Sequence, residues 1–111
     1  MISFDAPKEL NRWLDGSLTK IREKGVEVEV RRPSEADRFN KAMVGLSAEP
    51  LLCSLTVWGN GMIELIIVNS VTKQDLIFED IECSSKIEVL EMLDRSLEKF
   101  FGSMDGEVED N

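Results

Sequence analysis

The chain has no histidine and no tyrosine among its 111 residues. Histidine is the commonest general base of enzymes and the commonest protein ligand of transition metals, so a hydrolase or a zinc enzyme would lack its usual parts. Serine or cysteine nucleophiles would likewise have no imidazole to activate them. We therefore expect a protein that is not an enzyme, with no catalytic residues, no cofactor and no metal site.

Cysteines are few, and long apolar runs are missing. Cys53 and Cys83 are the two cysteines. They lack the C-x-x-C spacing of redox and metal motifs, so we expect two reduced, half-buried thiols. No window of about 18 apolar residues predicts a membrane span. The first five residues have neither the basic nor the apolar region of a secretory signal. These absences predict a cytoplasmic protein that does not act at a membrane.

Charge is unevenly distributed along the chain. Residues 1–41 carry nine basic and eight acidic side chains, a net charge of +1, whereas residues 42–111 carry four basic and fourteen acidic ones, a net charge of −10. Together they give the total of −9. The acidic part would repel nucleic acid and attract a basic protein, although acidic surfaces also serve solubility alone.

Helical periodicity marks both ends of the chain. Near the N-terminus, apolar residues recur at three- and four-residue steps and predict a helix over residues 6–24: Leu10, Trp13, Leu14, Leu18 and Ile21. Near the C-terminus, Ser85 and Glu88 form a capping box that opens a helix over residues 86–101, which we expect Gly102 to end. Residues 1–102 are then a single domain, and residues 103–111 an acidic, frayed tail.

Five strands are expected between the two helices, over residues 26–31, 41–46, 51–58, 62–68 and 74–80. In the second strand, Met43 and Gly45 share one face, and Ala42, Val44 and Leu46 the other. Leu76 and Phe78 are the expected core pair of the fifth strand, although a shift of one residue would turn Ile77 inward instead. The polar segment from Arg32 to Arg38 contains a proline and is expected to be a loop. Short connections favour an antiparallel meander, and helices on one face of it make an α+β two-layer sandwich.

The strongest local signal is the turn Gly59-Asn60-Gly61 between two apolar runs. A type I turn with a G1 bulge requires Gly61 to have a positive φ, and it pairs Trp58 with Met62 across the hairpin. One face then carries apolar residues: Cys53, Leu55, Val57, Ile63, Leu65 and Ile67. The other face is mixed: Ser54, Thr56, Trp58, Met62, Glu64 and Ile66.

The mixed face is the candidate partner site. Exposed aromatic and methionine side chains with an acidic rim are typical of protein interfaces. Alternatively, a helix or residues 32–40 cover this face and make it core. The acidic groups Glu79/Asp80/Glu82 and Glu107/Glu109/Asp110 lack the spacing of a calcium loop and are expected to be solvated. The residues expected to contact a partner are Trp58, Met62, Glu64, Ile66, Glu79, Asp80 and Glu82.

The stretch Leu55-Thr56-Val57-Trp58-Gly59-Asn60-Gly61, followed by Glu64-Leu65, resembles the central hairpin of the TriTu family of bacterial immunity proteins. The leading helix, the segment Gly25-Val26-Glu27-Val28 and the closing helix through Phe101 fit the same layout, so the resemblance spans about residues 8–101. It implies a cytosolic protein that neutralises a toxin delivered between bacteria. It supplies no binding residues.

Two functions therefore remain open. An immunity protein would use its acidic half to block a basic toxin domain, such as a nuclease, whose active site is basic because it holds phosphates. A small acidic secretion chaperone or adaptor would instead bind an effector protein. Either partner is a protein, not a nucleic acid or a membrane, and the chain itself is expected to be a monomer or a homodimer.

Overall fold

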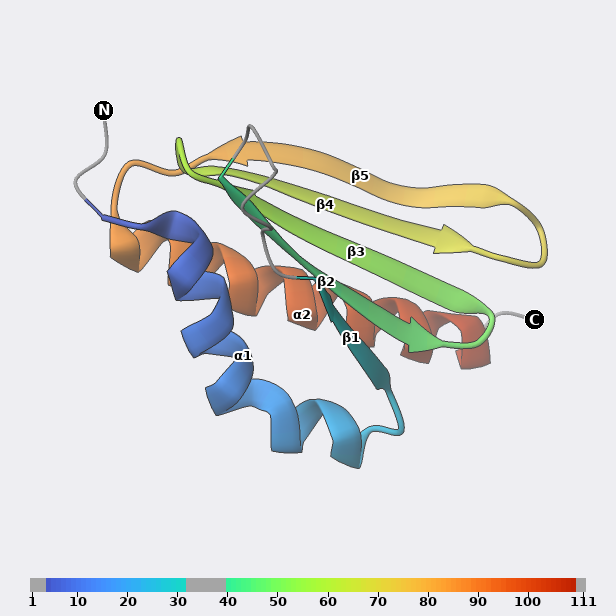
Figure 1. Ribbon diagram of the computed structural model, residues 1–111. Helices are drawn as coiled ribbons and strands as arrows, with labels where there is room; N and C mark the ends of the chain where they lie inside the picture. Colours follow the sequence, from blue (N-terminus) through green and yellow to red (C-terminus); the bar gives the residue numbers. More distant parts are fainter. Residues whose placement is uncertain (1–3, 32–39, 110–111) are drawn as a thin grey trace.

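The chain folds into two layers, a sheet and a pair of helices (Figure 1). The computed structural model describes residues 4–31 and 40–109. In chain order the elements are α1 (Ala6–Glu23), β1 (Glu27–Arg31), β2 (Lys41–Ala48), β3 (Leu51–Trp58), β4 (Met62–Asn69), β5 (Gln74–Glu82) and α2 (Lys86–Glu109). The strands pair antiparallel in the order β1-β2-β3-β4-β5. The predicted α+β sandwich with a five-stranded meander is confirmed, while the predicted loop from Arg32 to Arg38 falls outside the described residues.

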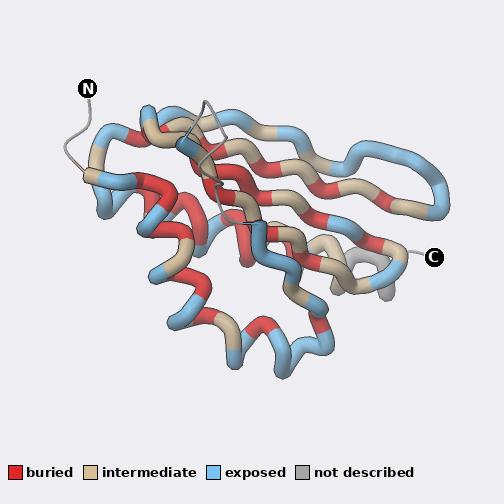
Figure 2. The backbone as a smooth tube through the Cα atoms, viewed as in Figure 1, coloured by how far each residue is buried: buried red, intermediate tan, exposed pale blue. Residues whose placement is uncertain are grey.

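The core lies between the two layers (Figure 2). Both helices cover the same face of the sheet, so alternate residues of each central strand are buried there. Leu55 and Leu65 are fully buried from the sheet side, and Leu10 and Phe100 from the helix side. Among the described residues, neither helix has the length and apolar character needed to cross a membrane.

Polar contacts fix the helices against each other at one end. The Trp13 indole Nε1 donates a hydrogen bond of 2.7 Å to Oδ1 of Asp94 on α2. Glu9 is only 5% exposed, and its carboxylate lies 3.3 Å from the Arg12 guanidinium and 3.9 Å from the Lys86 ammonium. Because a buried carboxylate is costly unless paired, these contacts join the start of α1 to the start of α2.

The hairpin has the predicted turn and register. Gly61 has a φ of 91°, its N–H donates to the carbonyl of Trp58 at 2.9 Å, and the Asn60 side chain accepts from Met62 N–H. Leu55 lies opposite Leu65, Thr56 opposite Glu64, and Val57 opposite Ile63, as expected for the three-residue loop.

The expected core pair of the fifth strand is wrong. Leu76 and Phe78 are exposed, by 37% and 60%, whereas Ile77 and Ile81 pack against the core. The ladder shifts between Ile67, which lies opposite Ile77, and Val68, which lies opposite Asp75. The extra residue of β5 at this shift lies between Asp75 and Ile77. Because side chains alternate along a strand, it exchanges the faces of the residues that follow it in β5.

The expected end of α2 at Gly102 is also wrong. The helix continues through Gly102 to Glu109, and both Phe101 and Met104 pack against the core on either side of the glycine. Gly102 is exposed and has no neighbour near the position of a Cβ, so the helix passes it without a clash. The domain boundary at residue 102 and the fraying of the tail stay predictions.

The start of α2 is capped by two serines. The Ser85 hydroxyl accepts a hydrogen bond from the Glu88 N–H at 3.1 Å, as the capping box predicts. The Glu88 carboxylate accepts from the N–H and the hydroxyl of Ser84, at 3.2 and 2.8 Å. These hydrogen bonds, chiefly those from Ser84, lower the pKa of Glu88 because they stabilise its charged form.

Replacing Gly61 should destabilise the protein. Gly61→Ala places a Cβ on a residue whose φ is 91°, so we expect a loss of about 1 kcal/mol or more in the free energy of unfolding. Denaturant unfolding measures it. As a control, Gly16→Ala lies on the exposed side of α1 with open space around it and should gain about 0.5–1 kcal/mol. Equal effects of the two substitutions would contradict the strained turn.

The Glu88 cap should make stability depend on pH. Because the pKa of Glu88 is lowered from its ordinary value of 4.5, its contribution is present above pH 4.5 and is lost as the pH falls through the folded-state pKa. Wild type should therefore exceed Glu88→Gln in stability at neutral pH and converge with it in acid. Urea unfolding across a pH series measures the difference, which should shrink in a Ser84→Ala background. A difference independent of pH would argue against the cap.

Candidate functional site

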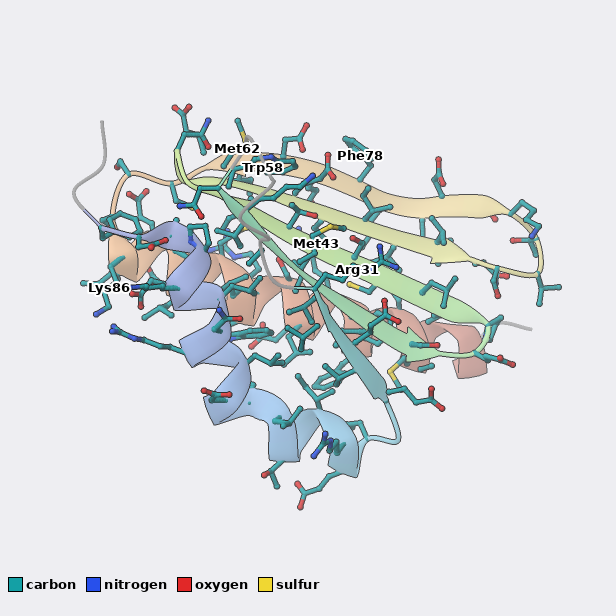
Figure 3. The ribbon with its side chains drawn as sticks, in the orientation of Figure 1. Arg31, Met43, Trp58, Met62, Phe78 and Lys86 are labelled. Atoms are coloured by element: carbon teal, nitrogen blue, oxygen red, sulfur yellow. The ribbon has the colours of Figure 1, made fainter. Side chains whose placement is uncertain are left out.

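The face of the sheet that neither helix covers is the candidate site, and we call it the open face. Trp58 and Met62 at the tip of the hairpin, Phe78 on β5, and Arg31 and Met43 beside them all lie on this side of the sheet (Figure 3). Its residues are those that alternate with the buried positions: Glu27, Glu29, Arg31, Lys41, Met43, Gly45, Ser47, Leu52, Ser54, Thr56, Trp58, Met62, Glu64, Ile66, Val68, Phe78, Asp80 and Glu82.

The apolar part of the open face runs across β3, β4 and β5. Trp58, Met62 and Ile66 are half-buried, and Ile66 lies directly opposite Phe78, whose ring is the most exposed aromatic side chain of the sheet. Thr56 is buried although it belongs to this face, since it lies between Met43 and Glu64. Among the described residues, the side chains of the open face pack on one another and no helix covers them. Residues 32–39, part of the segment expected as an alternative cover, lie outside the described residues.

The acidic part of the open face lies on β4 and β5. Glu64 is directly opposite Asp80. The next pair on the same face is Met62 and Glu82. Like charges placed opposite each other destabilise a sheet, and salt or a cationic partner relieves the repulsion. Within the part of the chain that the structure describes, no cation lies within ion-pair distance of these three carboxylates.

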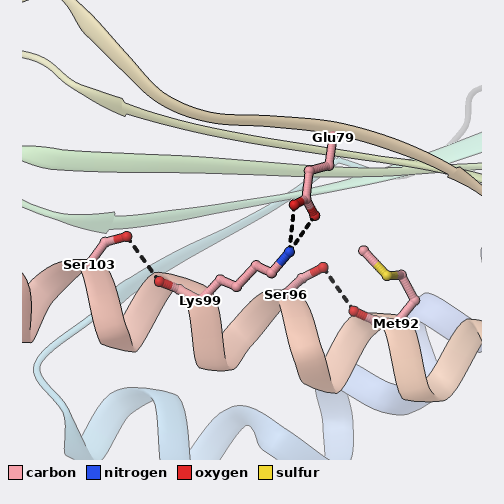
Figure 4. A network of polar contacts seen from close by, with 5 residues as sticks. All are labelled: Glu79, Met92, Ser96, Lys99 and Ser103. Carbon is pink, nitrogen blue, oxygen red and sulfur yellow. Dashed lines mark hydrogen bonds and ion pairs between the residues drawn. The ribbon is translucent and has the colours of Figure 1, made fainter.

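The structure thus brings together six of the seven residues expected to contact a partner: Trp58, Met62, Glu64, Ile66, Asp80 and Glu82. Glu79 lies apart from them, on the face toward the helices. Its side chain points to α2, where Oε1 accepts a hydrogen bond of 2.6 Å from the Lys99 ammonium (Figure 4). Glu79 is half-buried, so the expectation that it is solvated beside Asp80 is wrong.

Sequence reasoning missed Phe78 and Leu52 as members of the open face. Phe78 was assigned to the core because the extra residue in β5 carries no signal of its own in a run of apolar residues. Leu52 is 41% exposed, and its position was predictable from its alternation with Leu51 and Cys53, both of which are buried.

Neither thiol is available for chemistry in the folded chain. Cys53 and Cys83 are free and buried. Burial raises the pKa of Cys53 to about 12, and burial together with the nearby Glu88 carboxylate raises the pKa of Cys83. Both are therefore protonated at neutral pH, which makes them poor nucleophiles.

The described residues contain no group of three or more histidine, cysteine, aspartate or glutamate side chains arranged to hold a metal ion. This applies to Glu79, Asp80 and Glu82, which the strand divides between two faces. The other acidic group, Glu107, Glu109 and Asp110, falls outside the described side chains.

A family model described as "Immunity protein TriTu" matches residues 8–101 of the chain. The matched region runs from the first turns of α1 through the whole sheet to Phe101 on α2. No curated protein and no solved structure matches the chain.

The corrected register of β5 predicts effects of different size on stability for substitutions at two adjacent residues. Ile77→Thr should cost about 1–2 kcal/mol of stability, because it replaces apolar atoms at the core with a hydroxyl. Phe78→Thr should stay within about 0.5 kcal/mol of wild type, as is usual for exposed positions. Thermal and denaturant unfolding of the two variants measure this, and the reverse order would restore the register expected from the sequence.

Proposed function

The chain belongs to the TriTu family of immunity proteins, and from this premise we propose that it neutralises a bacterial toxin by binding it with the open face. The single observation that carries the choice of surface is that both helices cover the other face, so that among the described residues no helix lies over this side of the sheet. Such a face offers apolar and charged groups side by side without any rearrangement of the core. The protein acts in the cytoplasm, with no membrane or nucleic acid as a partner.

The toxin domain is basic, and we infer that it is a nuclease. Residues 42–111 carry a net charge of −10, and the open face presents Glu64, Asp80 and Glu82 together. A nuclease holds the phosphates of its substrate with basic side chains, and carboxylates of an inhibitor can occupy the same positions. Charge of this kind raises the rate of encounter more than it strengthens the final complex.

The apolar side chains provide the persistent contact. Trp58 and Met62 form one apolar group and Ile66 and Phe78 a second, and the row of Thr56, Glu64 and Asp80 lies between them. Interfaces commonly combine a dry aromatic centre with a charged rim, and the centre governs how slowly the complex separates.

Reversing charge on the open face should slow association with the toxin. Asp80→Lys and Glu82→Lys are exposed substitutions, so they should leave the fold intact. Together they should lower the association rate roughly tenfold, and raising salt from about 0.05 to 0.5 M should slow the wild type in the same way. The measurement is surface-based or stopped-flow kinetics with the toxin domain encoded beside the gene for this chain.

The matched control reverses charge on the opposite layer. Glu98→Lys and Glu91→Lys are exposed on α2 and change the net charge by the same amount. They should have the smaller effect, and an equal effect would remove the open face as the binding surface. The toxin's nuclease activity is measured in parallel: an equimolar immunity protein should abolish it, whereas an adaptor or chaperone would form a complex and leave the activity in place.

A further inference from the structure

A hollow of about 460 Å³ opens at the other end of the open face, over strands β1, β2 and β3. Five of the residues around it belong to the open face: Glu27, Glu29, Gly45, Ser47 and Leu52. It is separate from the aromatic and acidic residues on β4 and β5, none of which lines it.

Gly45 is the reason that the hollow exists. It lies in the interior of β2, opposite Glu29 on one side and Ser54 on the other, and contributes no side chain to the face. Glycine weakens the interior of a strand and often marks a place where another molecule approaches the backbone closely.

Among the residues that the structure describes, none requires a glycine at this position. Positive φ values among the glycines occur at Gly25 and Gly61, and a Cβ built on Gly45 would have its nearest neighbours at 3.8 Å, an ordinary contact. Neither backbone conformation nor lack of space explains the missing side chain. No described side chain fills the volume above β2, so a group from outside can enter it.

The side chains that line the hollow suit a side chain with a long aliphatic stem and a positive charge at its end. Glu27 and Glu29 project from the same side of β1, and their Cα atoms are about 7 Å apart along the strand. Leu52, which is 41% exposed, offers an apolar wall for the aliphatic stem of such a side chain. Glu29 already accepts from the Arg31 guanidinium at 3.1 Å, in a pair that is about 70% exposed on both sides and thus easily exchanged.

We propose that this hollow receives one arginine or lysine side chain of the toxin, with its stem on Leu52 and its charge between Glu27 and Glu29. The inference rests on the proposed function, since the occupant belongs to the bound toxin. It adds a specific contact for the charged group at the β1 end of the open face, and strands β2 and β3 separate β1 from the acidic residues of β4 and β5.

The first experiment fills the hollow. Gly45→Val has room for its side chain and raises the β-propensity of the strand, so its melting temperature should equal or exceed that of the wild type. Its affinity for the purified toxin domain should fall tenfold or more. Thr19→Val, on an exposed position of α1, is the control and should bind as the wild type does.

The second experiment gives the sign of the occupant's charge. Glu29→Gln should weaken binding several-fold, whereas Arg31→Gln, which removes the competing cation, should strengthen it. Both residues are exposed, so the fold should survive both substitutions. An acidic occupant would reverse the two effects, and this result would overturn the proposal.

The outcomes separate this inference from the function on which it rests. Failure of the wild-type protein to bind the toxin overturns both. A wild-type protein that binds, together with unchanged affinity in Gly45→Val, overturns the occupied hollow alone. Loss of affinity in Gly45→Val with opposite effects of Glu29→Gln and Arg31→Gln supports a basic side chain in the hollow.

Discussion

The turn at Gly61 fixes the register of β3 and β4, and the rest of the molecule depends on that register. Because side chains alternate between faces, a slip of one residue would send Glu64 into the core and Leu65 out of it. The buried face of this hairpin is the surface on which α1 and α2 pack, so the helices can form their layer only where the turn has placed Leu55, Ile63 and Leu65. The backbone conformation of Gly61 thus determines which side chains of the hairpin lie in the core and which lie on the open face.

The one-sided helix layer accounts for both the buried core and the form of the open face. The helices bury one face of the central strands β2, β3 and β4, so the other face is free to carry residues that the fold does not need. Glu64 opposite Asp80 is an unfavourable pairing for the isolated sheet, and Gly45 is an unfavourable residue for a strand interior. Both are understandable if these positions serve the toxin, since selection for binding tolerates local costs that the core offsets.

Most of the fold could be predicted from the sequence because its signals are local and mutually consistent. The turn chemistry of Gly59-Asn60-Gly61 and the period-two pattern around it predict the same register, and the capping box at Ser85 marks the start of α2. The fifth strand could not be predicted in this way. Leu76, Ile77 and Phe78 are all apolar, so the sequence alone cannot reveal which of them the shifted ladder turns inward.

The misplaced residues follow from that shift and from tertiary contacts. Glu79 was grouped with Asp80 because both are acidic, yet its face was set by the extra residue three positions earlier, and Lys99 lies 20 residues away along the chain. Gly102 has the identity of a helix stop, but the packing of Phe101 and Met104 against the core outweighs the weak preference of one glycine. The hollow over Gly45 could not be predicted from the sequence, because its lining comes from three strands and depends on their register.

The alternation of core and open-face residues along every central strand has a consequence for how such a protein can diverge. Val57 and Trp58 are neighbours in the chain, yet one holds the layers together and the other faces outward. Substitutions on the outward side leave the interior intact, and under the proposed function they change recognition of the toxin. Effects at well-separated positions on a sheet tend to add. A lineage could therefore exchange one toxin for another by accumulating changes at every second residue, without ever passing through an unfolded intermediate.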